Sequence, residues 1–120
     1  MKQVTRLILA ISGAAVLASC AGMDGGPLIR PGEPTGTLQV VNNSSRTFSA
    51  VLISHCDHYT YGFNRLPDGA RIPPGGVYSF TVSSGCWDVN SGLAYQEARV
   101  TDLHVAPGGV TRAIITDPQE

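Results

Sequence analysis

The sequence predicts an all-β domain of about six or seven short strands, preceded by a signal helix and a flexible tether. From Gly36 onward, runs rich in Val, Ile, Thr, Phe and Tyr alternate with Gly, Pro, Asn and Ser, which is the pattern of consecutive strands. No stretch of this region has a sustained helical period. The spacing of the runs is that of a small sandwich or barrel.

The N-terminal segment has the build of a secretory signal. Lys2 and Arg6 precede an apolar run over residues 7–17, which is shorter than the roughly 20 residues of a membrane-spanning helix. It ends in Leu17-Ala18-Ser19-Cys20, which resembles the bacterial lipobox. The resemblance implies that Cys20 is lipidated and becomes the first residue of the mature chain.

An ordinary cleaved signal that leaves Cys20 as a thiol is the alternative. The chain has three cysteines, so lipidation of Cys20 leaves Cys56 and Cys86 as an even pair. In lipoproteins of double-membraned bacteria the residue after the lipidated cysteine directs sorting. Ala21 at that position implies the outer membrane, although Asp24 lies close by.

Processing leaves a single small domain. Removal of residues 1–19 leaves 101 residues, with six basic residues against nine acidic ones. We expect no nucleic-acid partner, because phosphate binding needs clustered Lys and Arg. Residues 20–35 are rich in Gly and Pro and are expected to form a tether. An arm packed on the domain through Leu28 and Ile29 is the alternative.

Residues 36–120 form the predicted domain. The first strand covers residues 37–41 and the second covers 47–55, whose apolar centre at 50–53 favours a place in the interior of a sheet. A long irregular stretch, residues 56–72, follows.

The second half supplies the remaining strands. Residues 77–82 and 86–90 are separated by Ser83-Ser84-Gly85, and we interpret them as a hairpin. Residues 93–103 and 110–116 complete the set.

A short repeat marks two corners. Pro74-Gly75-Gly76-Val77 recurs as Pro107-Gly108-Gly109-Val110. Proline at the first central turn position and glycine at the second predict a type II turn that leads into a strand. Two copies are too few for a solenoid.

The chain from Gly36 onward also resembles the small β-sandwich domains of short bacterial lipoproteins. The points of likeness are residues 40–45, 61–66, 72–75 with Phe80, and 85–89. The resemblance implies an immunoglobulin-like or related sandwich of antiparallel strands, and it brings no catalytic residues.

Cys56 and Cys86 are expected to form a disulfide, since paired cysteines in a small exported domain usually do. A bridge that closes a loop of this length restricts the unfolded chain by about 3.5 to 4 kcal/mol in the entropic treatment. Free thiols for metal or redox chemistry are the alternative.

His55, Asp57 and His58 are the residues that suit a metal ion best. Neighbours in an extended segment point to alternate faces, so only a turn brings His55 and His58 together. Structural zinc sites usually have four ligands, and His104 is the only other histidine. We expect no metal and no cofactor here, and solvated loop residues instead.

Aromatic residues give the better lead to function. If the bridge draws the loop over the strand that carries Trp87, several rings gather beside His55 and His58 and form a surface for a protein or glycan. The alternative, which a small core favours, makes Trp87 and Phe63 core residues. The possible binding surface comprises His55, His58, Tyr59, Tyr61, Phe63, Trp87 and Tyr95.

No catalytic pattern stands out. The chain has no Gly-x-Ser-x-Gly motif, and its paired turn glycines precede no predicted helix that could bind phosphate. We expect a non-enzymatic envelope lipoprotein, anchored in the membrane by lipid, that binds an envelope protein or glycan or serves as an accessory subunit. The alternative is a small metal- or ligand-binding periplasmic lipoprotein that uses residues 55–58, with a hydrolase as a distant third possibility.

Overall fold

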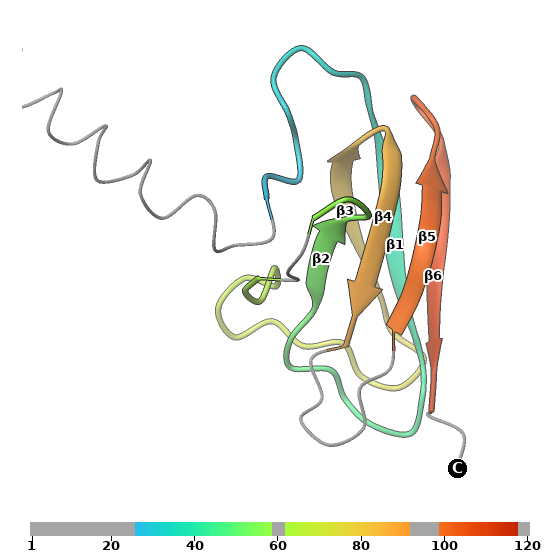
Figure 1. Ribbon diagram of the computed structural model, residues 1–120. Coiled ribbons are helices and arrows are strands. Elements are labelled where there is room, and N and C mark those ends of the chain that lie inside the picture. The colour runs from blue at the N-terminus through green and yellow to red at the C-terminus, as the bar shows by residue number, and fades with distance from the viewer. Residues whose placement is uncertain (1–25, 59–61, 92–98, 118–120) are drawn as a thin grey trace, which may run out of the picture.

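The computed structural model describes residues 26–58, 62–91 and 99–117. These residues contain six strands in two three-stranded sheets that face each other (Figure 1), and no helix. The strands are β1 (Thr35–Asn43), β2 (Leu52–His55), β3 (Val77–Ser83), β4 (Gly85–Asn90), β5 (Arg99–Val105) and β6 (Val110–Thr116). The all-β prediction is confirmed, and the predicted signal helix lies outside the described residues.

Strand β1 is the centre of the first sheet, whose order is β3-β1-β6. It pairs antiparallel with β3 and parallel with β6. The expectation that all strands are antiparallel is therefore wrong for one pair. Two strands joined by a hairpin turn are antiparallel. Strands β1 and β6 are the first and last of the described strands, so no hairpin turn joins them and they can pair in parallel.

The core lies between the two sheets. Along β1 every second residue is buried, as expected for a strand with one face on a core. The second sheet, of order β2-β4-β5, is entirely antiparallel and supplies Trp87 near the centre. The buried apolar residues are Leu38, Val40, Phe48, Val51, Ile53, Leu66, Ile72, Phe80, Val82, Trp87, Val89, Val105, Ala113 and Ile115.

Both Pro-Gly-Gly corners are turns of the predicted type. Gly75 and Gly108 have φ of 81° and 69°, and the fourth residue of each turn donates to the carbonyl of the first over 2.8 Å and 2.9 Å. The first turn also bonds to β1 at Asn42, which donates to the Gly76 carbonyl and accepts from the Gly75 N–H.

The second turn makes the same pair of bonds at the opposite end of β1. There Gly108 donates to the Thr35 carbonyl and Thr37 donates to the Gly109 carbonyl, each over 2.8 Å. The repeated sequence therefore closes both ends of the central strand.

The predicted hairpin of residues 77–82 and 86–90 is wrong. Strand β3 pairs with β1, whereas β4 pairs with β2 and β5 in the other sheet. Gly85 has a φ of 135°, which lets the chain change direction directly after β3. The segment at Ser84 is a corner between sheets and does not reverse the chain within one sheet.

The second predicted strand is shorter than expected and does not lie inside a sheet. Strand β2 begins at Leu52 and forms the edge of its sheet. Upstream, Phe48 makes an isolated bridge to Ile72 with two backbone hydrogen bonds of 2.9 Å. Val51 and Ile53 are buried nonetheless, because their side chains pack in the hydrophobic core, and the loop that follows bonds to the backbone at this edge.

The last two strands match the sequence in part. Strand β6 has the predicted bounds, and β5 begins at Arg99, while residues 92–98 of the predicted strand lie outside the described residues. Strand β5 contains a bulge opposite Asp88, at which Asp102 adopts a φ of 57°.

Gly36→Ala should destabilise the fold by about 1 to 3 kcal/mol, because overpacking at a rigid contact forces the backbone to move. A β-carbon on Gly36 would lie 2.5 Å from the Ala106 carbonyl oxygen and 2.6 Å from Cγ1 of Val105. Denaturant unfolding measures the change. Ser79→Ala, at an exposed position of β3, is the control and should stay within about 0.5 kcal/mol of the parent. Equal stability of both variants would contradict this contact.

Candidate functional site

Residues 26–34, here called the N-terminal arm, lie against the domain. Leu28 packs on the core, and its carbonyl accepts the Ser83 N–H over 2.8 Å. The Arg30 N–H donates to the Ser83 hydroxyl over 2.7 Å. For these residues the contacts agree with the alternative of a packed arm, although Ile29 is half exposed. Residues 20–25 of the expected tether lie outside the described residues.

Arg65 holds the start of the arm. Its guanidinium donates to the Gly26 carbonyl and, through Nε and Nη2, to the Ile53 carbonyl over 3.2 Å and 2.9 Å. The neighbouring backbone also covers β2, since the Arg65 N–H donates to the Val51 carbonyl over 2.7 Å. One side chain thus protects an edge strand and fixes the arm to it.

A third Pro-Gly turn shapes the arm. Gly32 has a φ of 79°, and the Glu33 N–H donates to the Arg30 carbonyl over 3.2 Å. This turn brings the side chains of Arg30 and Glu33 together as an ion pair. The hydrogen bond from Arg30 lowers the pKa of Glu33, so the carboxylate is ionised at neutral pH.

The N-terminal arm contacts the indole ring of Trp87. The Arg30 guanidinium carbon lies 5.7 Å from the centre of the indole, within cation–π range. The His55 ring meets the same indole edge-on, with centroids 5.6 Å apart. The indole N–H donates to the Ser83 carbonyl over 2.8 Å, which fixes the ring.

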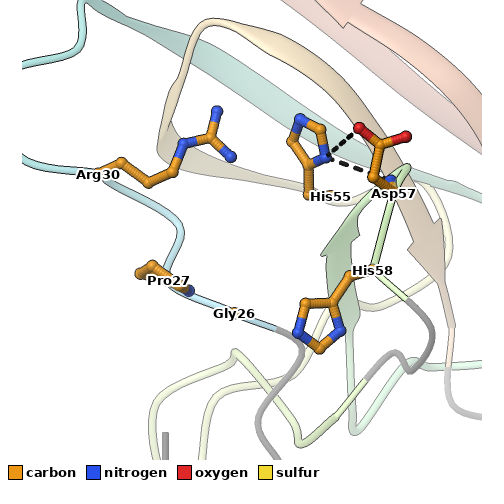
Figure 2. Close-up of a pocket in the computed structure, with 6 residues that line it drawn as sticks. All are labelled: Gly26, Pro27, Arg30, His55, Asp57 and His58. Carbon is orange, nitrogen blue, oxygen red and sulfur yellow. Dashed lines mark hydrogen bonds and ion pairs between the residues drawn. The ribbon is translucent and has the colours of Figure 1, made fainter. Parts of the chain in front are cut away.

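A pocket of about 260 Å³ opens between the arm and the turn that follows β2 (Figure 2). We call it the arm pocket. It offers one guanidinium, two imidazoles and one carboxylate around a floor of arm backbone. Its lining residues are Gly26, Pro27, Arg30, His55, Asp57 and His58.

The two histidines of the pocket point to different sides. A turn does form, with the His58 N–H on the His55 carbonyl at 2.9 Å. Figure 2 nevertheless shows the His58 ring turned toward Gly26, away from His55 and Asp57. His55 Nδ1 accepts the Asp57 N–H over 3.2 Å and lies 3.7 Å from its carboxylate. Among the described residues, these three do not form a ready cluster of metal ligands.

The aromatic residues of the expected binding surface differ in their exposure to solvent. Trp87 is fully buried, in agreement with the core interpretation, whereas Phe63 is 60% exposed, against it. Tyr59, Tyr61 and Tyr95 lie outside the described residues. His55 and His58 are both half-buried at the pocket.

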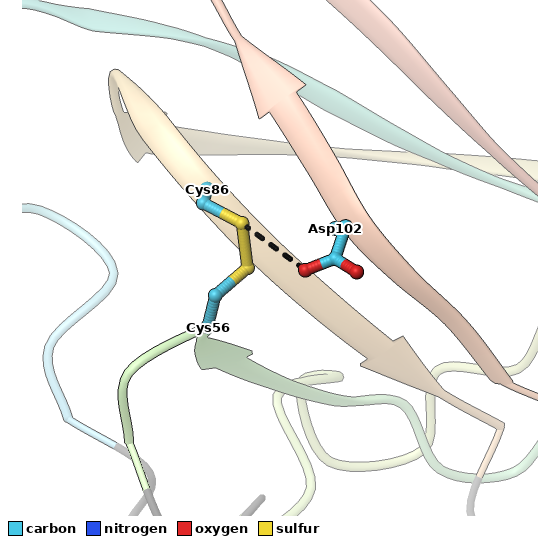
Figure 3. Close-up of side chains that lie close together, drawn as sticks. All are labelled: Cys56, Cys86 and Asp102. Atoms are coloured by element: carbon cyan, nitrogen blue, oxygen red, sulfur yellow. Dashed lines mark hydrogen bonds between the residues drawn. A yellow bond between two sulfur atoms is a disulfide. The ribbon is translucent and has the colours of Figure 1, made fainter.

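The predicted disulfide between Cys56 and Cys86 is present, with Cα atoms 5.5 Å apart (Figure 3). Two carboxylates flank it. Oδ1 of Asp88 lies 3.4 Å from the sulfur of Cys56, and Oδ1 of Asp102 lies 3.8 Å from the sulfur of Cys86. Bridged sulfurs carry no hydrogen, so these are close contacts rather than hydrogen bonds. The backbone N–H of Asp102 donates to Oδ1 of Asp88 over 2.8 Å, which holds the Asp88 side chain against β5.

Cys56, Cys86 and Asp102 place their possible ligand atoms within 4.8 Å of one another. Cys56 and Cys86 could bind a metal ion only as thiolates, but the disulfide holds both sulfurs in the oxidised form. In the structure this group is therefore a disulfide with acidic neighbours.

Arg30, Arg65 and the buried Ser83 are the site residues that sequence reasoning missed. A signal for the arm was present, because Pro31-Gly32 repeats the dipeptide that marks the corners at residues 74–75 and 107–108. Nothing in the local sequence of Arg65 indicated that it bonds to Gly26, since that contact joins residues far apart in the chain.

Comparison of the chain with protein-family models, with curated proteins and with solved structures found no match. Within the described part of the chain, no helix has the length and apolar character to cross a bilayer. The two resemblances noted in the sequence thus stay predictions.

Arg65→Met should release the start of the arm, because it keeps the apolar stem and removes every donor. Amide hydrogen exchange reports this directly, since the Ser83 N–H is bonded to the Leu28 carbonyl. We expect the Ser83 amide to lose protection while amides in the middle of β1 keep theirs. Arg112→Met, at an exposed position of β6, should change neither. Unchanged protection at Ser83 would show that Arg65 does not hold the arm.

The Asp88→Asn, Asp102→Asn double variant should be reduced by dithiothreitol several-fold faster than the parent. The two carboxylates repel an attacking thiolate, and asparagine keeps the shape, the Asp102 hydrogen bond and the tolerance of positive φ. Alkylation of new thiols followed by mass spectrometry gives the rate. Asp68→Asn removes one exposed charge elsewhere and should leave the rate unchanged. High salt should reduce the difference; equal rates at low salt would refute the repulsion.

Proposed function

We propose that this protein is a non-enzymatic lipoprotein of the bacterial cell envelope, anchored through Cys20, whose domain binds an envelope protein or glycan or serves as an accessory subunit. The lipobox-like Leu17-Ala18-Ser19-Cys20 supports the anchor. The Cys56–Cys86 disulfide supports an exported location, because such bridges persist in oxidising compartments. Ala21 favours the outer membrane.

The arm pocket is the observation on which the binding role rests. It is lined by groups suited to recognition: the Arg30 guanidinium, which is paired with Glu33, the imidazoles of His55 and His58, which face different sides, and the Asp57 carboxylate. These groups offer donors and acceptors to hydroxyls, amides and acids. Its volume, about 260 Å³, is slightly below that of common ligand pockets, and it suits a sugar ring or one side chain of a larger partner.

The second candidate, a small ligand bound at residues 55–58, is favoured by the same open pocket. Its metal-binding form is less favoured, because the two imidazoles face different sides. Binding of zinc would need the His58 ring to leave its place against Gly26.

Lipidation is tested on the full chain produced in a double-membraned bacterium. We expect an intact mass that corresponds to a chain starting at an acylated Cys20, and recovery in the outer-membrane fraction. The Cys20→Ser variant cannot be acylated, so it should either keep residues 1–19 uncleaved or be released from the membrane. A mature chain that starts elsewhere would refute the anchor.

Binding is tested with a photo-crosslinking amino acid at His58, at the pocket, in the intact envelope. We expect adducts to one defined protein or to a glycan at this position. The same group at Val110, which is exposed on β6, serves as the control. Equal patterns at both positions, or no adduct at His58, would refute a binding role for the pocket.

A further inference from the structure

The described chain begins at a fixed place on the domain. Arg65 donates a hydrogen bond to the Gly26 carbonyl. The His58 ring packs against Gly26, so closely that a β-carbon added to Gly26 would lie 3.4 Å from Cδ2 of His58. Two residues later, Leu28 is partly buried and packs against the core. Gly26, the first described residue, therefore lies beside the turn that follows β2 (Figure 2).

The chain between the expected anchor and this point is short. Five residues, 21–25, lie between Cys20 and Gly26, so six Cα–Cα steps join the two. A fully extended chain advances at most about 3.3 to 3.6 Å per residue, so Gly26 stays within about 21 Å of the lipidated cysteine. A small domain is itself wider than this. The end of the domain that carries Gly26 is therefore kept within about 21 Å of the lipidated cysteine, whatever conformation residues 21–25 adopt.

Among the described residues, Phe63 is the most exposed of the large apolar side chains near that end, and Ile29 of the arm is half exposed. Phe63 is 60% exposed and stands two residues before Arg65, the residue that holds Gly26. The base of its loop is rigid, because the side-chain oxygen of Asn64 accepts the Val51 N–H over 2.8 Å and the Leu66 N–H over 3.0 Å. An exposed ring on a rigid base costs little entropy when it enters an interface.

The charges around this end are balanced. Arg30 is paired with Glu33, and the Asp57 carboxylate is almost fully exposed near His55 and His58. Such a mixture gives little attraction to anionic headgroups. Contact with a bilayer would therefore depend on aromatic insertion rather than on lipid charge.

We propose that this end of the domain is a membrane-contact surface, in which Phe63 inserts into the phospholipid interface and Gly26 and the turn at residues 55–58 face the headgroups. The proposal rests on the lipid anchor of the proposed function and adds the orientation of the domain. The other strongly exposed apolar residues of the strands are Val77, Val110 and Ile114, which belong to the β3-β1-β6 sheet. That sheet then faces away from the bilayer or to its side.

The test uses the full lipidated chain in vesicles of phosphatidylethanolamine and phosphatidylglycerol. A Phe63→Cys variant carries an environment-sensitive fluorophore on the introduced thiol, since the other cysteines are bridged or lipidated. We expect a blue-shifted emission that lipids with a nitroxide near the headgroup quench strongly. Val110→Cys is the matched control, because Val110 is 62% exposed, and it should be quenched several-fold less.

Mass spectrometry of the same samples separates the two proposals. If Cys20 is acylated but positions 63 and 110 are quenched equally, the membrane-contact surface is refuted and the anchored binding module stands. If Cys20 is not acylated, the anchor and the orientation both fail. Strong quenching at position 63 should persist in vesicles of phosphatidylcholine alone, because insertion of the ring needs no lipid charge. Loss of the quenching in these vesicles would overturn the aromatic mechanism.

A second variant tests the ring itself. The fluorophore is placed at the exposed Asp57, with Phe63 either retained or changed to Ser. We expect quenching at position 57 to fall several-fold in the Phe63→Ser protein, while thermal unfolding stays unchanged, because an exposed ring contributes little to the core. Unchanged quenching would show that Phe63 does not hold this end on the bilayer.

Discussion

Hydrogen bonding along both edges of β1 is the constraint on which the rest of the fold depends. The strand pairs with β3 on one side and with β6 on the other, and each of its ends is bonded to a Pro-Gly-Gly turn. At one end the Asn42 side chain adds bonds from its amide to the carbonyls of Arg46 and Ile72, of 2.6 Å and 2.8 Å. Because both turns also lead out to other strands, the pairing of β1 sets where β3 and β6 begin.

The second sheet depends on different interactions. Strand β4 lies between β2 and β5 and carries both Trp87 and Cys86, so one strand supplies the largest core side chain and one half of the disulfide. The bridge ties the end of β2 to β4, and Arg65 closes the open edge of β2. The arm then packs over the indole through Arg30, so the same ring that fills the core supports the arm that lines the pocket.

The same contacts connect the domain to its proposed anchor. A tether would allow the domain to turn freely, but a docked arm leaves only five residues between Cys20 and the bonded Gly26. In the proposed orientation, the arm pocket and Phe63 lie at the end that faces the membrane. In this arrangement a partner that reaches the pocket must approach along the bilayer surface, as an envelope glycan or a neighbouring membrane protein can.

The sequence by itself determined the all-β class, the bounds of β6, the two Pro-Gly-Gly turns and the Cys56–Cys86 pair. Each of these follows from local chemistry: side-chain alternation, the φ that proline and glycine adopt, and the count of cysteines in an exported chain. Only the tertiary structure decided that β3 and β4 belong to different sheets, that β1 and β6 run parallel and that Trp87 is buried while Phe63 is exposed. It also decided that residues 26–34 lie on the domain, since Arg65, Ser83 and Trp87 meet the arm across distances in sequence that no local pattern encodes.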